Sequence, residues 1–128
     1  MSKQVTFEGG CLCGNIRFAA KAPANNSHTC SCMQCQTHSG SFTLSWVEFS
    51  SDNVTWTGPG GKPSVWRSSD YSCRAFCNQC GSTIGAINDE PTIALATGTF
   101  DKPHLKTLKP QSHSYVSRKP KWWNVNID

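Results

Sequence analysis

The sequence lacks any apolar run long enough to cross a membrane. Only 37% of its 128 residues are hydrophobic, whereas a spanning helix needs about 20 consecutive, mostly apolar residues. The opening decapeptide, MSKQVTFEGG, also lacks the apolar core of a secretory signal. We therefore expect no membrane association and a cytoplasmic location, where cysteine thiols stay reduced.

Long runs of like charge are missing too. Twelve Lys and Arg residues against eight Asp and Glu residues give a net charge of +4, but nowhere do five like charges follow one another, as they do in many binding tails. The basic residues are densest between Lys102 and Lys121. No DNA- or RNA-binding motif accompanies them, so we do not expect a nucleic-acid partner. A solvated face or a small anionic ligand remains as the explanation of the charge.

Helical periodicity is the third absence. Apolar residues instead step by two along the chain, as in Val5/Phe7, Ile16/Phe18, Phe42/Leu44/Trp46, Val54/Trp56 and Ile93/Leu95. Glycine and proline punctuate these stretches, and the only helix we expect is a short turn after Cys32. No repeat or linker divides the chain, so the sequence predicts one all-β domain over residues 1–128. Its core is lean, and we expect most of the five tryptophans to be buried in it.

Cysteine, in contrast, is abundant, with eight residues. Disulfides are disfavoured because Cys11 and Cys13, like Cys30 and Cys32, are only two positions apart and because a reducing compartment is expected. Metal binding is the favoured interpretation for most of these thiols.

Cys11 and Cys13 form the first pair. In a straight strand their Cα atoms would lie about 6.6 Å apart on one face, but two sulfurs bound to one tetrahedral zinc lie only about 3.8 Å apart. The backbone must therefore curl between them. The flanking Gly10 and Gly14 permit that curl.

Cys77 and Cys80 form a second pair with the C-x-x-C spacing of a zinc knuckle, and Gly81 frees the turn that follows. Together the two pairs supply four thiolates, which is a complete tetrahedral structural site. Such a site would fasten the N-terminal hairpin to the middle of the sheet. The alternative is two unrelated pairs of reduced thiols.

Three further cysteines crowd into six residues: Cys30, Cys32 and Cys35. A fourth zinc ligand could come from His28, His38 or Cys73. Each also has an ordinary explanation, since a histidine is often a surface or hydrogen-bonded residue and a free cysteine is often buried. Without a fourth protein ligand, three thiolates would leave zinc an open corner, as catalytic zinc sites do.

The order of these motifs resembles the glutathione-dependent formaldehyde-activating enzyme (GFA) family. The resemblance runs from about Gly9 to Trp122 through GGCLCGNIRF, TCSCMQCQTHSGS, FCNQCGSTI and GTFDKP. It implies a β-tent of short antiparallel strands stapled by a structural zinc, with a second, catalytic zinc. The structural ligands of the family are matched by Cys11, Cys13, Cys77 and Cys80. The catalytic ligands are matched by Cys30, Cys32 and Cys35.

The resemblance also implies a reaction. The family is named for joining glutathione to formaldehyde, and its activity is classed as that of a carbon–sulfur lyase. The partners it implies are a small thiol, with glutathione as possible co-substrate, and an aldehyde.

Five other residues are candidates for this chemistry. His38 and Ser39, with Ser41 nearby, could donate to a developing alkoxide, although Ser-Gly-Ser is also ordinary turn chemistry. Arg17 and Arg74 could grip the carboxylates of a thiol substrate, or could be exposed strand residues. Asp101 is expected to cap a turn.

Two functions of different classes follow. The first is a zinc-dependent carbon–sulfur lyase acting on a small thiol–aldehyde adduct. The second is a non-catalytic zinc β-tent module that binds a protein or polymer through residues 102–121, which a second site closed by His38 or Cys73 would favour. If that site holds zinc weakly, Cys32 and Cys35 could instead be oxidised to a disulfide.

Overall fold

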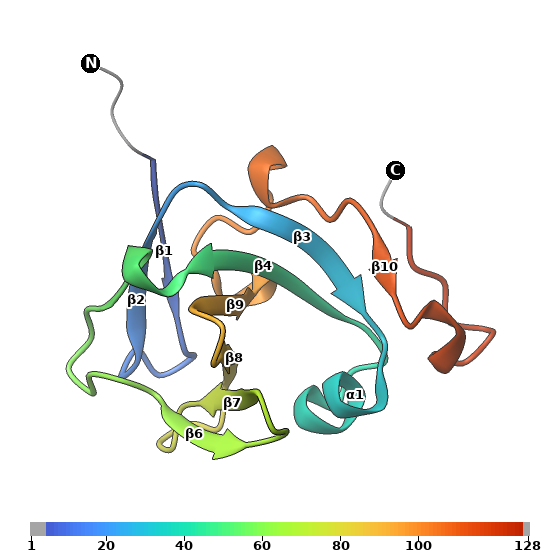
Figure 1. Ribbon diagram of the computed structural model, residues 1–128, viewed down its shortest axis with the longest axis horizontal. Coiled ribbons are helices and arrows are strands. Elements are labelled where there is room, and N and C mark those ends of the chain that lie inside the picture. The colour runs from blue at the N-terminus through green and yellow to red at the C-terminus, as the bar shows by residue number, and fades with distance from the viewer. Residues whose placement is uncertain (1–4, 127–128) are drawn as a thin grey trace.

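The computed structural model describes residues 5–126 and places their strands in two sheets (Figure 1). The smaller sheet has three strands, in the order β1 (Thr6–Gly10), β2 (Arg17–Lys21) and β5 (Val54–Trp56). The larger has seven, in the order β10 (His113–Ser114), β3 (Asn25–Cys30), β4 (Leu44–Ser50), β9 (Thr92–Ala96), β8 (Thr83–Asn88), β7 (Ser72–Phe76) and β6 (Ser64–Arg67). The predicted all-β fold is confirmed. Of the predicted domain, residues 1–4 and 127–128 lie outside the described residues.

Neighbouring strands pair antiparallel except at one edge, where β10 runs parallel to β3. The larger sheet is curved, and α1 (Met33–Ser39) lies below it, beside the end of β3 (Figure 1). Short 3-10 turns lie between other strands at Ser51–Asn53, Thr97–Thr99 and Lys106–Leu108, and a fourth, Val116–Arg118, follows β10. The single described α-helix begins directly after Cys32, as predicted.

The alternation of the strands separates two apolar clusters on opposite faces of the larger sheet. Val47 and Phe49 of β4 point into the main core between the sheets, where Phe7, Phe18 and Phe100 meet in tilted and edge-on contacts. Trp46 points to the other face, where it packs with Cys30 and Cys35. The second face therefore carries the cysteines, while the first supplies most of the apolar packing.

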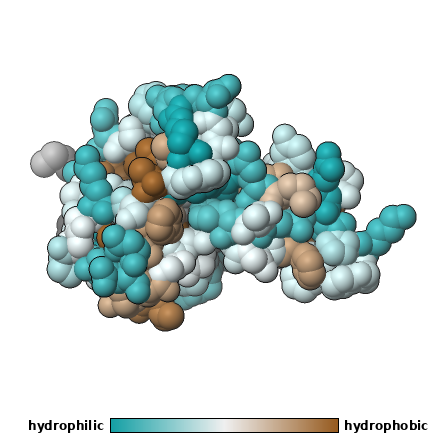
Figure 2. Space-filling view, turned by 90° about the horizontal axis from the view of Figure 1, so that it is seen from below, coloured by the Kyte–Doolittle hydropathy of each residue, from teal (hydrophilic) through white to brown (hydrophobic). Residues whose placement is uncertain are grey.

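The expectation that most tryptophans are buried is wrong. Trp46 is only 3% exposed, but Trp66, Trp122 and Trp123 are 67%, 72% and 40% exposed. Trp66 lies on β6 at an edge of the sheet, and the other two belong to the C-terminal segment, where they pack on Phe42. A space-filling view from below shows a narrower lobe on the side where Figure 1 places that segment (Figure 2).

The structure also bears on membrane association. Its one α-helix in the described range has seven residues, and no helix there has the length and apolarity to span a bilayer.

Candidate metal centres

Four cysteine sulfurs meet where the turn between β1 and β2 touches the turn between β7 and β8. The Sγ atoms of Cys11 and Cys13 lie 3.6 Å apart, and those of Cys13 and Cys77 lie 3.8 Å apart. Cys80 completes the group, in which all four sulfurs lie within 4.8 Å of one another. These separations fit the roughly 3.8 Å expected between two thiolates on one tetrahedral zinc. The cluster could therefore hold zinc.

Two glycines shape these turns. Gly14 and Gly81 both adopt left-handed backbone conformations, with φ of 82° and 80°, which glycine reaches without steric penalty. The Gly14 amide donates to the carbonyl of Cys11 (3.2 Å), and that of Gly81 donates to the carbonyl of Cys77 (2.8 Å). Each pair of cysteines is thus curled by a glycine that follows it, which explains how two strand ends present four sulfurs to one point.

Hydrogen bonds join the two turns and support thiolates. The amide of Leu12 donates to Ser82 Oγ across the junction (3.0 Å), and the amide of Ile16 donates to Cys11 Sγ (3.2 Å). The Ser82 hydroxyl, with its backbone amide, lowers the pKa of the Cys80 thiol to about 5. A lowered pKa favours the deprotonated form that binds metal.

The second cluster brings together the sulfurs of Cys30, Cys32 and Cys35, again within 4.8 Å of one another. Cys30 ends β3. Cys32 is the N-cap of α1, where its sulfur accepts a hydrogen bond from the amide of Cys35 (3.4 Å). The cap places the sulfurs of the C-x-x-C motif side by side. Among residues 5–126, no fourth His, Cys, Asp or Glu ligand atom belongs to this group.

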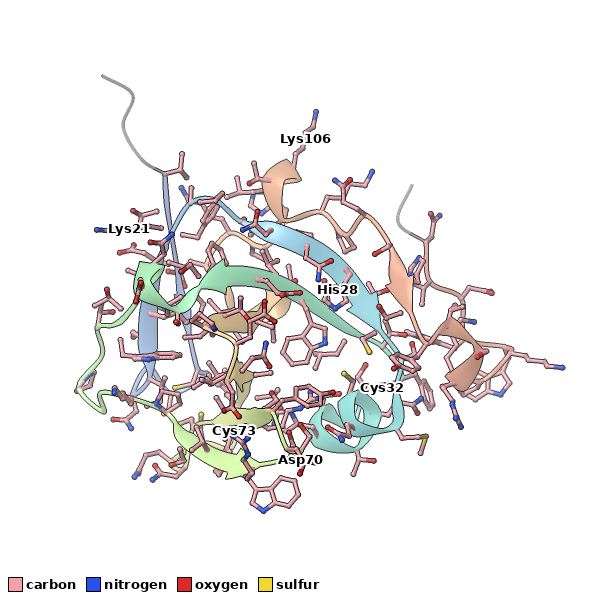
Figure 3. All side chains as sticks on the ribbon, viewed as in Figure 1. Lys21, His28, Cys32, Asp70, Cys73 and Lys106 are labelled. Atoms are coloured by element: carbon pink, nitrogen blue, oxygen red, sulfur yellow. The ribbon has the colours of Figure 1, made fainter. Side chains whose placement is uncertain are left out.

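The candidates for a fourth ligand point elsewhere. The Nδ1 atom of His28 contacts the carbonyl of Asn26 (2.7 Å). Cys73 lies on the lower strands, well away from Cys32 (Figure 3), and its sulfur faces Arg67 Nη1 at 3.7 Å. It is half-buried rather than part of the core.

His38 is neither a member of the cluster nor an ordinary surface histidine. Both of its ring nitrogens are buried and have no hydrogen-bond partner among the described residues. His38 is among the residues that line a hollow of about 380 Å³, together with Trp66 and Arg74. Burial, followed by the nearby Arg74 charge, lowers the pKa of His38, so the imidazole is neutral at neutral pH.

Arg74 stands directly beside the three-cysteine cluster. Its Nη1 and Nη2 atoms lie 3.7 and 3.8 Å from Cys35 Sγ, and its guanidinium lies over the ring of Trp46, 5.3 Å from the centroid. The hydrogen bond from the Cys30 thiol lowers the pKa of Cys35 to about 5 against the opposing effect of burial, and Cys32 and Arg74 add to that lowering. Arg74 therefore stabilises a thiolate of the cluster.

The structure places Arg17 and Ser39 in structural contacts. Arg17 forms a two-pronged ion pair with Asp101, at 2.9 and 2.5 Å, so that Asp101 joins a loop to β2. The hydroxyl of Ser39 donates to the carbonyl of Cys35 (2.7 Å) near the end of α1. Neither side chain is directed at the cysteine sulfurs.

A hollow of about 200 Å³ opens beside the cluster on the concave face of the sheet. Its floor includes Ala86 and Ala94 on the central strands, and its walls include Cys30, Glu48 and Arg74. Because alanines occupy the middle of the face, side chains do not fill it. The strand segments TIALA and TIGAIN contain these alanines in an alternating pattern, but only the pairing of the two strands shows that Ala86 and Ala94 lie opposite each other.

The comparisons with known proteins bear on this arrangement. A family model described as glutathione-dependent formaldehyde-activating enzyme matches residues 6–118. The chain belongs to that family. No curated protein matches the chain. A crystal structure of a Rhodobacter sphaeroides protein, a structural genomics target, has a TM-score of 0.63 at 13% identity, over 84% of this chain and 99% of that one. At that identity the likeness shows a shared fold and nothing about function.

Proposed function

We propose that the protein is a zinc-dependent carbon–sulfur lyase of the GFA family that acts on a small thiol–aldehyde adduct, with glutathione and formaldehyde or a related pair as reactants. One observation carries the proposal. Three sulfurs, those of Cys30, Cys32 and Cys35, converge beside a hollow without a fourth protein ligand in the described part of the chain. A purely structural zinc site has four protein ligands.

The two cysteine clusters take different roles in this proposal. Cys11, Cys13, Cys77 and Cys80 would hold a structural zinc, and Cys30, Cys32 and Cys35 would hold a catalytic one. When bound there, zinc would keep a substrate thiol deprotonated at neutral pH, where a free thiol with a pKa near 8.5 is only a few per cent ionised.

The reaction requires the movement of one proton. When the adduct forms, a bond joins the thiol sulfur to the aldehyde carbon, the carbonyl π bond breaks, and the thiol proton ends on the oxygen; the lyase direction reverses each change. Of the two candidates near the cluster, His38 suits this step better than Ser39. The Ser39 hydroxyl is bonded to the Cys35 carbonyl, whereas the neutral imidazole of His38 has two unpartnered nitrogens among the described contacts.

The test is metal content per chain, read with X-ray absorption at the zinc edge in the presence and absence of glutathione. We expect two zinc ions per chain, one of which gains a sulfur ligand from glutathione. Cys35→Ser should remove one zinc and the response to glutathione. Cys73→Ser is the matched control, because Cys73 lies outside both clusters, and it should keep both. Two four-coordinate zincs that ignore glutathione would refute the proposal.

A binding module is the second candidate, and an aromatic patch favours it. Phe42 packs edge-on against Trp122, with ring centroids 5.2 Å apart, and also contacts Trp123. Next to them Lys121 is exposed, and the half-buried Lys119 donates from its Nζ to the carbonyl of Trp123. Patches that join aromatic and basic side chains suit polymers and protein partners. A second zinc that never responds to thiols would move attention to this patch.

We also propose a reducing, cytoplasmic setting. All eight cysteines are free in the structure, and both clusters need reduced thiols to bind metal. A disulfide between Cys32 and Cys35 would remove two of the three ligands proposed for the catalytic zinc.

A further inference from the structure

Three of the four arginine side chains have a charged or sulfur partner within the protein. Arg17 pairs with Asp101, Arg67 pairs with Asp89 and Arg74 contacts Cys35. Arg118 differs, because its exposed guanidinium has no hydrogen bond or ion pair with any of the residues 5–126. An arginine without a partner beside a reactive site is a candidate for recognising a ligand carboxylate.

Arg118 lies at the mouth of the three-cysteine site. It lines a hollow of about 330 Å³ together with Cys32, Arg74 and Tyr115. This hollow differs from the concave one on the sheet, although Cys32 and Arg74 border both. A ligand whose sulfur reaches the cluster can therefore extend its other end past Cys32 toward Arg118.

Backbone contacts fix the segment that carries Arg118. In β10, Ser114 pairs with Cys30, and its carbonyl accepts from the amide of Ser31 (3.0 Å). On the other side, Gln36 Nε2 donates to the carbonyl of Arg118 (3.1 Å). The C-terminal segment is thus bonded to the cysteine loop both before and after Tyr115, so its position relative to the cluster is defined.

Tyr115 has an unusual backbone. Its φ of 56° lies in the left-handed region, where Asn26 is the only other described non-glycine residue. A bulky residue remains in this conformation only when its surroundings enforce it, and such residues gather at functional sites. Here the contacts of Ser114 and Arg118 enforce it, and the turn leaves the Tyr115 side chain 64% exposed beside the same hollow.

The charge of the three-cysteine site indicates what Arg118 could do there. With Zn²⁺ bound, the three thiolates would leave one net negative charge, which Arg74 would balance, and the thiolate of a substrate would make the site negative again. A substrate with an additional carboxylate would be repelled unless a second cation received it. From these observations we propose that Arg118, with Tyr115 as a hydroxyl donor, forms a carboxylate-binding subsite that makes the site prefer thiols bearing an acid group. This inference rests on the proposed function.

The test is a titration of the cobalt-substituted protein with two thiols of equal size, 3-mercaptopropionate and 3-mercaptopropionamide, followed by the sulfur-to-cobalt absorption band. The wild-type protein should bind the acid about three- to fivefold more tightly, because an exposed ion pair contributes modestly. The preference should shrink as salt is raised. Arg118→Gln should abolish it while the amide still binds, and Arg118→Lys should retain part of it.

Lys121→Gln is the matched control. Lys121 lies on the same segment and is exposed, but it is not among the residues that line the hollow. It should keep the full preference. If Arg118→Gln keeps the preference, or if Lys121→Gln loses as much, the subsite does not exist although thiol binding stands. If neither thiol changes the cobalt spectrum of the wild-type protein, the proposed function fails and the subsite falls with it.

Discussion

Arg74 and Cys35 show how one contact sets the chemistry of the three-cysteine cluster. The guanidinium donates toward Cys35 Sγ from 3.7 and 3.8 Å, while the Arg74 Nε atom is buried without a partner among the described residues. The side chain therefore depends for its contacts on the sulfur, on the face of Trp46 and on Gln34 Oε1, to which Nη2 donates at 3.4 Å. This dependence links the charge of Arg74 to the ionisation of Cys35.

Replacing Arg74 should make Cys35 less acidic. In Arg74→Gln the thiolate loses a nearby positive charge, so the pKa of Cys35 should rise. In the metal-free protein, the rate at which iodoacetamide alkylates Cys35 at pH 6 should fall accordingly, as mass spectrometry of the Cys35 peptide would show. Arg67→Gln is the control, because Arg67 faces Cys73 instead. An unchanged Cys35 rate in Arg74→Gln would show that the neighbouring thiols alone set its acidity.

At the scale of single residues, the sequence predicted the grouping of the cysteine sulfurs better than it predicted the contacts of the arginines. Cysteine spacing reflects short turns, which local backbone geometry controls, and the structure brings the sulfurs together in the predicted groups. The roles of Arg17 and Arg118, in contrast, depend on contacts between residues that are far apart in the sequence. Arg17 is 84 positions from Asp101, and Gln36 is 82 positions from Arg118. No local pattern encodes these separations.

Among the elements, the pairing of β8 with β9 depends on a glycine. A Cβ atom on Gly85 would lie 2.3 Å from the carbonyl oxygen of Ala94, which belongs to the neighbouring backbone. Gly85→Ala should therefore destabilise the protein by about 1–3 kcal/mol, as overpacking does. Gly98→Ala provides the control, since its Cβ would meet no atom within 4 Å. Denaturant midpoints of the two variants should differ clearly, and equal midpoints would mean that β8 and β9 shift apart at little cost.

The ion pair of Arg17 with Asp101 fastens a loop to β2 and should depend on pH. Arg17 lowers the pKa of Asp101 below its ordinary value of 3.8. A carboxylate with a lowered folded pKa contributes stability above its unfolded pKa and loses that contribution as the pH falls through the folded value. Asp101→Asn should thus lower the free energy of unfolding by less than about 1 kcal/mol at pH 7, because the pair is partly exposed.

The same comparison at low pH supplies the check on Asp101. Wild type and Asp101→Asn should approach equal stability as the pH falls through the lowered folded pKa of Asp101, because below it the carboxylate is protonated in both folded and unfolded chains. A difference that persists unchanged there would come from lost packing or hydrogen bonding rather than from the charge.

Strand periodicity predicted the elements well and their edges poorly. The alternation at Trp46 and at Ile93/Leu95 falls on β4 and β9. The two-residue β10 is too short to leave a period, and its parallel pairing with β3 depends on a distant segment. The exposure of Trp66 also depends on strand order, because only that order shows that β6 lies at an edge of the sheet and leaves the ring exposed.

For the whole molecule, the four-cysteine cluster joins the two sheets at one end. Its two turns come from different sheets, and Cys11 and Cys77 are at the same time members of the main core, with 8% and 0% exposure. The three-cysteine cluster instead involves β3 and α1 on the face of the larger sheet that is turned away from the main core. The two clusters should therefore differ in what their loss does to folding.

Cys80→Ser should destabilise the whole protein, whereas Cys35→Ser should not. Removing a ligand from the four-cysteine cluster weakens a metal whose binding stabilises the folded state, and structural zinc in small domains contributes on the order of 10 kcal/mol. We expect Cys80→Ser to lose its cooperative thermal transition or to melt at a far lower temperature. Cys35→Ser should shift the melting temperature by only a few degrees, roughly what a change of about 1 kcal/mol produces.

Chelation distinguishes the two clusters without mutation. As a chelator is added to the wild-type protein, zinc at the three-cysteine cluster should leave first, because three protein ligands hold a metal less firmly than four. Near-ultraviolet circular dichroism of the core aromatics should stay constant during this first loss and collapse with the second. If the signal collapses with the first zinc, or if Cys35→Ser unfolds as readily as Cys80→Ser, both metals support the fold. The three-cysteine cluster would then be structural, and the open site on which the proposed chemistry depends would be absent.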